Sequence, residues 1–580
     1  MKCFSRYYFS ILLCLSSCLL FAQQKTVYVG AAGDNAADGL TAAHPLKTFA
    51  EAIKQLLPGD TLYLLPGVYH EKMVFDNKKG EAEKYIYIYG VPGKEKPVID
   101  GGAAVPAMEL ENNWIEINKS AWIEFGDLSF INGWTDPIRV TNSAYISFRN
   151  CDIKGGRKVI LGTGAETHHL LVEGCTWDQG GEALWTLEKD ARGVDGWLSM
   201  HHELMGYFNG TLVDSRASGG SFVIRNNRIS NAYNGIRLTS KKGYDANIEV
   251  YNNTLNNIRD NDFEPEHYAF NLHIYHNRSH NIHKTLSVDD VAGGYIYYYG
   301  NTISMDADEW SKKICSGFNK IYGGEDSLSF PLYIFNNSFF GYGKNFNAME
   351  KKARQLKHFN NAYFFAGADG WVLKYVDPTN AFENDLSNKP WPQSLVEHNM
   401  EQQGKIADVR YVNSAKGDLH INSNSPAKDA GRIMSFPELG WTQAYKGKAP
   451  DIGAYENNDL VEGPPFRFRL PDSAKFSYKE RPRIVRYRAE GKKLFIYFSD
   501  QINTSSVTPL TILLGSHGRR IAVFDASFPN SKYELVIETK TKIDPATIAI
   551  GFQSLPRGMN GMPVTYWASV LPVFTRPSTD

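Results

Sequence analysis

The densest group of acidic residues on predicted strands lies between residues 260 and 290. Asp262 and Glu264 flank Phe263, and side chains alternate along a strand, so an inward Phe263 leaves both acids pointing outward. Asp289 takes a similar outward position about one repeat later. Two carboxyl groups about 5–9 Å apart can hydrolyse a glycosidic bond, one as the acid and the other as nucleophile or base. We therefore predict Asp262 and Glu264 as a catalytic pair, with Asp289 adjusting a pKa through its like charge.

Three further charged residues are expected around this acidic group. Ile236 and Leu238 face inward in the predicted strand NGIRLT, so Arg237 points outward beside the acids. Lys284 and Asp260 are expected at the margin, as substrate contacts. The alternative interpretation is a solvated charge ladder that Arg237 and Lys284 balance. Crowding carboxylates on one sheet costs stability, which favours a functional role for the group as a whole.

A long insertion, residues 186–220, separates two of the predicted repeats. It contains His201 and His202, which we predict as substrate contacts, and Trp185 directly before it could stack on a sugar ring. Packing within the loop explains the histidines equally well, and packing on the protein surface explains Trp185. The spacing of the remaining histidines predicts no metal site.

The positions of these side chains depend on a repeating strand pattern. The first apolar residues of successive strands are Ile123, Ile146, Leu170, Phe222, Ile248, Leu272, Ile296 and Leu332. The steps between them are 23, 24, 52, 26, 24, 24 and 36 residues, so one coil takes about 24 residues and two coils carry insertions. The strands alternate with period two, not with the period of about 3.6 that marks a helix. The sequence therefore predicts a solenoid of parallel strands.

A second column of residues follows five positions after each of these apolar residues. It comprises Leu128, Cys151, Cys175, Asn227, Asn253, Asn277, Asn301 and Asn337. Asparagine at one turn position of successive coils predicts an inward ladder of side-chain amides that satisfies polar groups at the bend. We interpret Cys151 and Cys175 as small interior residues of the same column. With Cys315 they are an odd number after signal removal, so no disulfide framework is expected.

The two ends of the solenoid and a change of pattern beyond it predict the domain organisation. TFAEAIKQLL (residues 48–57) predicts a short amphipathic helix that caps the N-terminal end of the stack. SPAKDAG (residues 425–431) and PDIGAYE (residues 450–456) are expected to finish it, so the solenoid domain spans residues 23–460. Residues 461–474 read as a linker. Residues 475–580, with alternating strands at sandwich spacing, predict an Ig-like β-sandwich accessory domain.

The N-terminus and the charge bear on location and partners. Residues 1–22 are typical of a signal peptide: Lys2 and Arg6 precede the apolar stretch Phe9–Leu20, and cleavage is expected after Ala22. We therefore expect a secreted or periplasmic protein, although Leu15–Cys18 resembles a lipobox and leaves an outer-membrane lipoprotein as the alternative. No other segment has enough consecutive apolar residues to span a membrane. The net charge of −1 argues against nucleic acid as a partner, and we expect a monomer.

Residues 27–75 resemble the first coil of right-handed parallel β-helix proteins of the polysaccharide lyase and glycoside hydrolase (pectin-lyase-like) superfamily. The likeness rests on Asp38–Gly39, the predicted helix, Pro58–Thr61, Gly67–Tyr69 and the closing SPAKDAG and PDIGAYE. With the coils, it covers most of residues 25–460. It implies an all-β, right-handed parallel β-helix that acts on carbohydrate. It implies no single reaction, because this fold hosts lyases, hydrolases, esterases and adhesins, and no family's catalytic set matches residue by residue.

The leading functional prediction is a glycoside hydrolase that cleaves a polysaccharide with the paired carboxylates. The first alternative is a polysaccharide lyase acting on a uronic-acid polymer, where Lys284 or Arg237 takes the C5 proton and Asp262, Glu264 or Asp289 hold Ca²⁺. Nearby carboxylates raise the pKa of a lysine, which counts against Lys284 as the base. The second alternative is a non-catalytic glycan-binding surface protein. Apart from Ca²⁺ in the lyase, no cofactor is expected.

Overall fold

The structure is a computed structural model, and it describes most of the chain after residue 23. The described residues are 24–82, 84–102, 113–180, 209–240, 246–289, 291–307, 317–322, 328–342, 347–348, 354–367, 380–390, 405–467, 469, 484–498, 501–516, 519–545, 547–552, 556 and 559. The expected signal peptide, residues 1–22, lies outside them. Within these ranges no helix combines the length and the apolar character that crossing a membrane requires.

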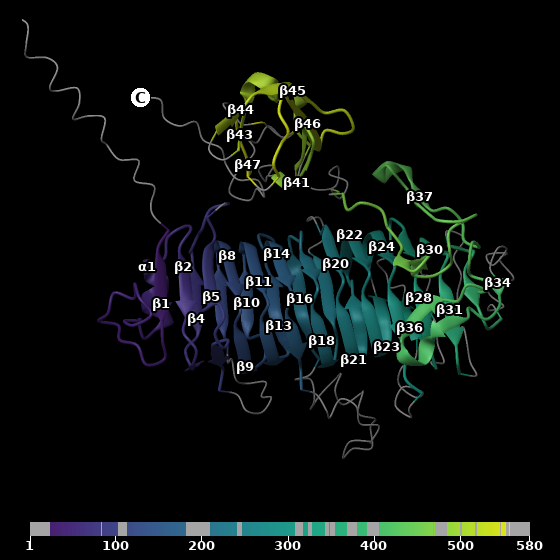
Figure 1. The fold of residues 1–580 in the computed structure, drawn as a ribbon, viewed down its shortest axis with the longest axis horizontal. Coiled ribbons are helices and arrows are strands. Elements are labelled where there is room, and N and C mark those ends of the chain that lie inside the picture. Colours follow the sequence, from purple (N-terminus) through teal and green to yellow (C-terminus); the bar gives the residue numbers. More distant parts are fainter. Residues whose placement is uncertain are drawn as a thin grey trace, which may run out of the picture.

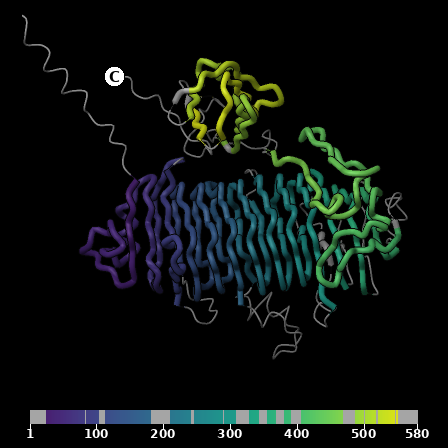
Figure 2. Tube along the Cα trace, in the orientation of Figure 1, coloured from purple at the N-terminus to yellow at the C-terminus, as the bar shows by residue number. Residues whose placement is uncertain are grey.

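The described strands stack into a long solenoid whose coils follow one another from the N-terminal end to the C-terminal end (Figures 1 and 2). Sheet A, one face of the coils, contains thirteen described strands that pair in parallel. These strands are β1 (Thr26–Val29), β2 (Thr61–Leu64), β5 (Ile86–Gly90), β8 (Ala121–Gly126), β11 (Ala144–Arg149), β14 (His168–Glu173), β17 (Val223–Arg225), β20 (Ile248–Tyr251), β22 (Tyr268–Tyr275), β24 (Ala292–Tyr299), β27 (Leu332–Phe335), β30 (Leu356–Phe359) and β32 (Ala381–Glu383).

Sheet B holds the other two faces of the coils. Its strands nearest the charged residues are β10 (Ile138–Thr141), β12 (Asp152–Gly155), β13 (Lys158–Thr163), β15 (Thr176–Asp178), β16 (Thr211–Ser218), β18 (Arg228–Ala232), β19 (Ile236–Ser240), β21 (Thr254–Glu264), β23 (Arg278–Asp289) and β26 (Gly317–Tyr322). The long strand β21 serves both faces: its first residues pair with β18 and its last two with β19. Each coil therefore has three faces, one in sheet A and two in sheet B.

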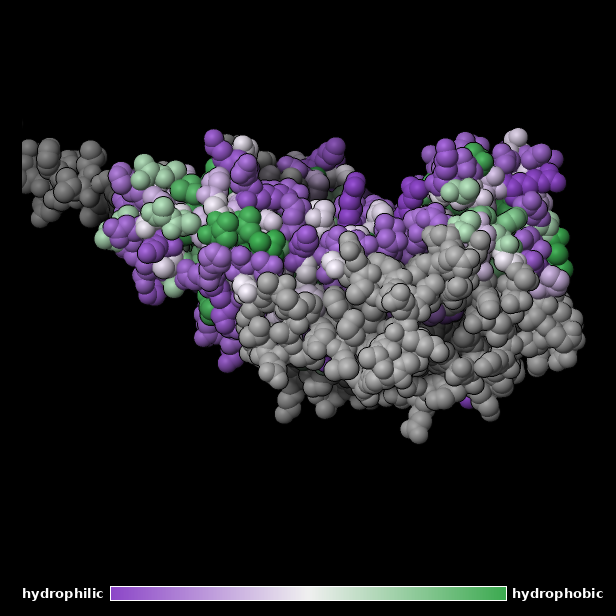
Figure 3. Space-filling view, turned by 90° about the horizontal axis from the view of Figure 1, so that it is seen from below, coloured by the Kyte–Doolittle hydropathy of each residue, from purple (hydrophilic) through white to green (hydrophobic). Residues whose placement is uncertain are grey.

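The predicted apolar column forms the core. Ile123, Ile146 and Leu170 lie side by side in register on β8, β11 and β14, and all three are at most 2% exposed. Because one face of every strand is buried, the register of each coil is fixed by its neighbours. One continuous hydrophobic cluster runs through the solenoid from Val27 to Phe382. By contrast, the described side chains on the face seen in Figure 3 are mostly hydrophilic, with hydrophobic groups toward the left and at the right-hand end.

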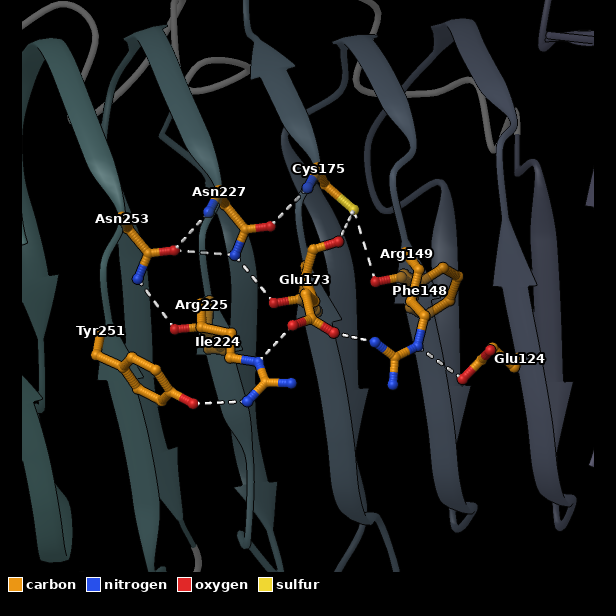
Figure 4. Close-up of polar contacts among 11 residues, drawn as sticks. Glu124, Phe148, Arg149, Glu173, Cys175, Ile224, Arg225, Asn227, Tyr251 and Asn253 are labelled. Carbon is orange, nitrogen blue, oxygen red and sulfur yellow. Dashed lines mark hydrogen bonds and ion pairs between the residues drawn. The ribbon is translucent and has the colours of Figure 1, made fainter. Parts of the chain in front are cut away.

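The predicted asparagine ladder is confirmed and is longer than the sequence analysis proposed. The Asn277 side-chain oxygen accepts from the backbone and side-chain amides of Asn253 at 3.0 Å, and its own amide donates to Asn301 at 3.1 Å. The pattern continues through Asn361 and ends on Asp385. At the other end Cys175 donates its backbone N–H to Asn227, so the buried cysteine belongs to the same column (Figure 4). The ladder satisfies the polar groups of each bend.

Both ends of the stack carry covering segments. Helix α1 (Phe49–Gln55) begins after Thr48, whose hydroxyl accepts from the Glu51 amide, and buries Phe49 against the first coils. At the far end Ala427 and Ile452 join a small hydrophobic cluster with Leu386 of the last described coils. These segments cover strand edges that would otherwise be open to pairing with another chain.

The C-terminal described residues form two antiparallel sheets apart from the coils (Figure 1). The four-stranded sheet comprises β41 (Ile484–Glu490), β42 (Lys493–Phe498), β45 (Val523–Ser527) and β46 (Glu534–Thr539). The three-stranded sheet comprises β43 (Ile512–Ser516), β44 (Arg519–Ile521) and β47 (Ile548–Phe552). Buried residues from both sheets, among them Ile496 and Ile550, share one hydrophobic cluster.

Replacing Asn277 with alanine should break the ladder near its centre. Asn253 would lose the acceptor of two amide groups, and the Asn301 oxygen would lose a donor. Buried polar groups without partners each cost about 1–3 kcal/mol, so we expect the free energy of unfolding to fall by about 3 kcal/mol. Urea denaturation followed by tryptophan fluorescence measures this, with the exposed Asn424→Ala as the control. Equal stability of the two variants would contradict a structural role for the ladder.

The ladder's last member, Asp385, should make stability depend on pH. Burial raises the pKa of its carboxyl to about 8, although hydrogen bonds from Asn361 lower it. The unfolded chain loses this proton near pH 4 while the folded chain keeps it, so this contribution to stability falls as pH rises from about 4 to about 8. Asp385→Asn should therefore raise the melting temperature at pH 8 more than at pH 4. A melting-temperature difference that does not change with pH would refute the assignment.

Candidate functional site

The candidate site lies on the outer face of the part of sheet B in which β13, β16, β19 and β21 pair side by side. Asp214, Arg237 and Glu264 are direct neighbours in one row across three coils. Their preceding neighbours Val213 and Ile236 are fully buried in the core. Because side chains alternate along each strand, these apolar residues direct the charged ones outward. Consecutive coils are about 4.8 Å apart, so residues distant in sequence meet here.

Arg237 and Glu264 form the strongest contact of the row. The guanidinium Nε and one terminal nitrogen donate to the same carboxylate oxygen of Glu264 at 2.7 and 2.6 Å, and Asn261 donates to the other oxygen at 2.7 Å. Desolvation lowers the pKa of Arg237, but the charges of Glu264 and Asp214 outweigh it and raise the pKa. The prediction that Arg237 and Glu264 lie side by side is confirmed.

Asp214 is the anionic centre of the row. Its side chain is buried, and one of its oxygens lies 3.4 Å from Lys158 Nζ, 3.6 Å from Arg216 and 3.9 Å from Arg237. Neither carboxylate oxygen has a hydrogen-bond partner among the described residues. Three cations thus surround one buried carboxylate at distances longer than ordinary hydrogen bonds.

Lys158 differs from the other cations of the set in that its pKa is lowered. Burial lowers the pKa of its ammonium group, and the positive charges of Arg216 and Arg157 act in the same direction, although Asp214 opposes them. A lysine whose pKa is lowered carries a larger fraction of neutral amine near neutral pH and can accept a proton. The adjacent Arg216, whose side chain is 56% exposed, connects the buried groups to solvent.

We call Lys158, Asp214, Arg216, Arg237 and Glu264 the charge cluster. Each buried ion loses hydration worth several kcal/mol, and its partners restore this only in part. Lys158 and Arg237, whose pKa values are shifted, lie on one surface, a pattern that makes this surface a candidate functional site. With Lys158 protonated, the three cations of the cluster exceed its two anions by one charge, and the charge of Glu266, which also acts on Arg237, offsets this excess.

The predicted outward orientation of Asp262 is wrong. Its side chain is fully buried in the coil interior, where burial raises the pKa of the carboxyl well above its ordinary value and the hydroxyls of Ser279 and Thr285 offset only part of that shift. The pairing of β21 with β23 shifts register between Ile258 and Asn261, so strict alternation fails just before Asp262. Asp262 therefore cannot form a carboxylate pair with Glu264 on the outer surface.

The other predicted site residues fall in three groups. Lys284 and Asp260 are both 4% exposed, and Lys284 pairs laterally with Asn261. Asp289 ends β23, but its side chain is not described. His201, His202 and Trp185 lie outside the described residues. Of the residues expected to hold Ca²⁺ in a lyase, Asp262 is interior and Glu264 is engaged by Arg237. In the part of the chain that is described, no group of three potential ligands suits a metal ion, and Ca²⁺ binding stays a prediction.

Sequence reasoning missed Lys158, Asp214 and Arg216. The signal for Asp214 was available, because it precedes Arg237 by 23 residues, close to one coil. The insertion of residues 186–220 obscured it by overlapping the strand TLVDSRAS (Thr211–Ser218). Lys158 belongs to the coil before the insertion, so no simple repeat step led to it.

The comparisons with known proteins concern the fold. A family model described as a right handed beta helix region matches residues 113–281. No curated protein matches the sequence. Among solved structures, the chain is similar to a GH136 lacto-N-biosidase from Eubacterium ramulus, with 13% identity, a TM-score of 0.34 and coverage of 66% of this chain and 67% of that one.

Two polysaccharide lyases are similar to the same extent. For a pectate lyase the identity is 11% and the TM-score 0.33, with 75% of this chain and 96% of that one covered. For a PL6 family alginate lyase the identity is 14% and the TM-score 0.36, with 69% and 55% covered. The parallel coils and the matching family model together identify the chain as a right-handed parallel β-helix protein.

Proposed function

We propose that this protein is a secreted carbohydrate-active enzyme that cleaves a uronic-acid polysaccharide by β-elimination at the charge cluster. One observation carries the proposal: Lys158, with a lowered pKa, lies on the same surface as Arg216, whose side chain is 56% exposed and can receive a carboxylate. The secreted location follows from the signal-like residues 1–22.

The cluster provides the groups that β-elimination requires. Arg216 would pair with the uronate carboxylate and make the C5 proton more acidic, since guanidinium groups bind carboxylates strongly. The neutral amine of Lys158 takes this proton as a general base. The electron pair forms the C4–C5 double bond, the bond from C4 to the bridging oxygen breaks, and water supplies a proton to the departing sugar. Asp214 holds Lys158 in place at 3.4 Å.

Hydrolysis is the second candidate, and one observation favours it. Asp214 and Glu264 lie two coils apart, about 10 Å, close to the separation of about 6.5–9.5 Å at which inverting glycosidases place their acid and base. However, two nitrogens of Arg237 donate to one oxygen of Glu264 and Asn261 donates to the other, so both oxygens of Glu264 already have partners. Elimination therefore fits this cluster better than hydrolysis does.

A panel of polysaccharides separates the candidates. The purified chain is incubated with polygalacturonate, alginate and neutral xylan, with and without EDTA, while absorbance near 235 nm and reducing ends are followed. Elimination predicts that both signals rise together on a uronic polymer. Reducing ends without absorbance would favour hydrolysis and overturn the elimination proposal. Binding without either product would leave the non-catalytic glycan-binding alternative.

Lys158→Met should abolish the base. We expect kcat to fall by about 10²–10⁴-fold, the usual contribution of a positioned general base. Lys158→Arg should be equally inactive, because it keeps the positive charge but cannot release a proton near neutral pH. Lys154→Met, at an exposed position on the neighbouring strand β12, is the matched control. Retained activity in Lys158→Arg would exclude the amine as the base.

The pH–rate profile should move in opposite directions in two variants. Activity requires neutral Lys158, so the rate rises with pH through its pKa. Arg216 lowers this pKa and Asp214 raises it, so Arg216→Ala should move the midpoint of the rise to higher pH and Asp214→Asn to lower pH. The measurement is kcat/KM against pH for the parent and both variants. A shift of both midpoints in the same direction would contradict the assignment of Lys158.

A further inference from the structure

A second concave surface lies on a different face of the same coils. It is a groove of about 420 Å³ on the outer face of sheet A, crossing β8, β11, β14 and β17. Its floor is made of three small or medium side chains that lie in one lateral row, Ser147, Leu171 and Val223. The coils that follow β11, β14 and β17 continue into β13, β16 and β19, so the groove and the charge cluster occupy the same segment of the helix.

One wall of the groove is aromatic. Tyr145 stacks on Trp122 with ring centres 3.6 Å apart and on His169 at 4.5 Å, and Tyr85 meets the edge of Trp122 at 5.3 Å. Stacked rings of this kind are rigid, because each is held by its neighbours. Tyr145 and Trp122 are 3% and 4% exposed, so the faces open to the groove are those of the half-buried Tyr85 and Tyr87. Tyr87 on β5 pairs laterally with Glu124, which pairs with Ser147, so it stands at the end of the floor row.

The opposite wall is a row of fixed guanidinium groups (Figure 4). Arg149 binds Glu124 at 2.9 Å and also pairs with Glu173, and Arg225 binds the other oxygen of Glu173 at 2.6 Å. Tyr251 accepts from Arg225 at 2.7 Å. In both arginines one terminal nitrogen has no partner among the described residues, as Figure 4 shows.

The arginines of this row are more exposed than its glutamates. The arginine side chains are 39% and 33% exposed, whereas Glu124 and Glu173 are 13% and 19% exposed. The acids therefore lie behind the cations and hold them in place. The surface presented to solvent consists of N–H donors at fixed positions, which suit the carboxylate and hydroxyl oxygens of a ligand.

We infer that this groove is a second binding site for a segment of an acidic glycan chain, separate from the charge cluster where the chain is cleaved. A sugar ring has an apolar face that fits the tyrosine wall and oxygens that accept from Arg149 and Arg225. Only the class of ligand, an acidic glycan, rests on the proposed function. A polymer bound in the groove stays close to the same coils that carry Lys158, which raises its local concentration at the cluster.

Binding by the full chain tests the inference without depending on catalysis. Affinity electrophoresis in gels containing polygalacturonate, alginate or neutral xylan compares the parent with Tyr87→Ala and Arg225→Gln. We expect both variants to bind the uronic polymers about tenfold more weakly, as the loss of one principal contact predicts. Tyr63→Ala, an aromatic residue on the same outer face in β2 but outside the groove, is the matched control. Unchanged melting temperatures exclude misfolding.

Kinetics then separate the two sites. If the chain cleaves a uronic polymer, Tyr87→Ala should raise KM for the polymer and leave kcat on short oligosaccharides unchanged. If no polymer is cleaved but the groove variants lose retention, the proposed reaction fails and the binding site stands. Retention of both variants equal to the parent and to Tyr63→Ala would overturn the inference, and so would loss of retention on xylan to the same extent as on the uronic polymers.

Discussion

The lateral contact of one coil with the next is the constraint on which the rest of the structure depends. Each strand hydrogen-bonds to the equivalent residues of the neighbouring coils. At each bend of the ladder, the side-chain amide of one asparagine donates to the side-chain oxygen of the next asparagine. If one strand slipped by one residue against the neighbouring coil, its apolar residues would turn outward and the asparagine ladder would be interrupted at the same time. Core packing and polar satisfaction thus enforce the same register, which makes the outward positions as well defined as the inward ones.

Both charged rows are consequences of that register. Residues at one outward position of successive coils are direct neighbours, and like charges placed opposite one another are destabilising, so opposite charges alternate. The row on sheet A runs Arg149, Glu173, Arg225, and the row on sheet B runs Asp214, Arg237, Glu264. They differ in exposure: the first offers partly exposed donors, which suits binding, while the second buries its carboxylates.

The sequence was sufficient for the features that depend on regular alternation. The coil step of about 24 residues predicted the apolar columns, the asparagine ladder and the contact of Arg237 with Glu264. It failed where the step or the alternation is broken. Phe263 points inward as predicted, but the register shift between Ile258 and Asn261 turns Asp262 inward as well. A regular repeat in the sequence does not show where the register of neighbouring strands changes.

The same reasoning explains why the charge cluster lies where the repeat is least regular. The longest step, 52 residues, adds its extra chain just before β16, the strand of Asp214 and Arg216. In a regular coil, an outward charge is hydrated and its pKa stays ordinary. A buried outward position instead strengthens every charge interaction through a lower local dielectric, which is how Arg216 and Arg157 act on Lys158. The apolar core of the neighbouring coils supplies the stability that tolerates this burial, so solenoid regularity and local irregularity are both needed for chemistry at this surface.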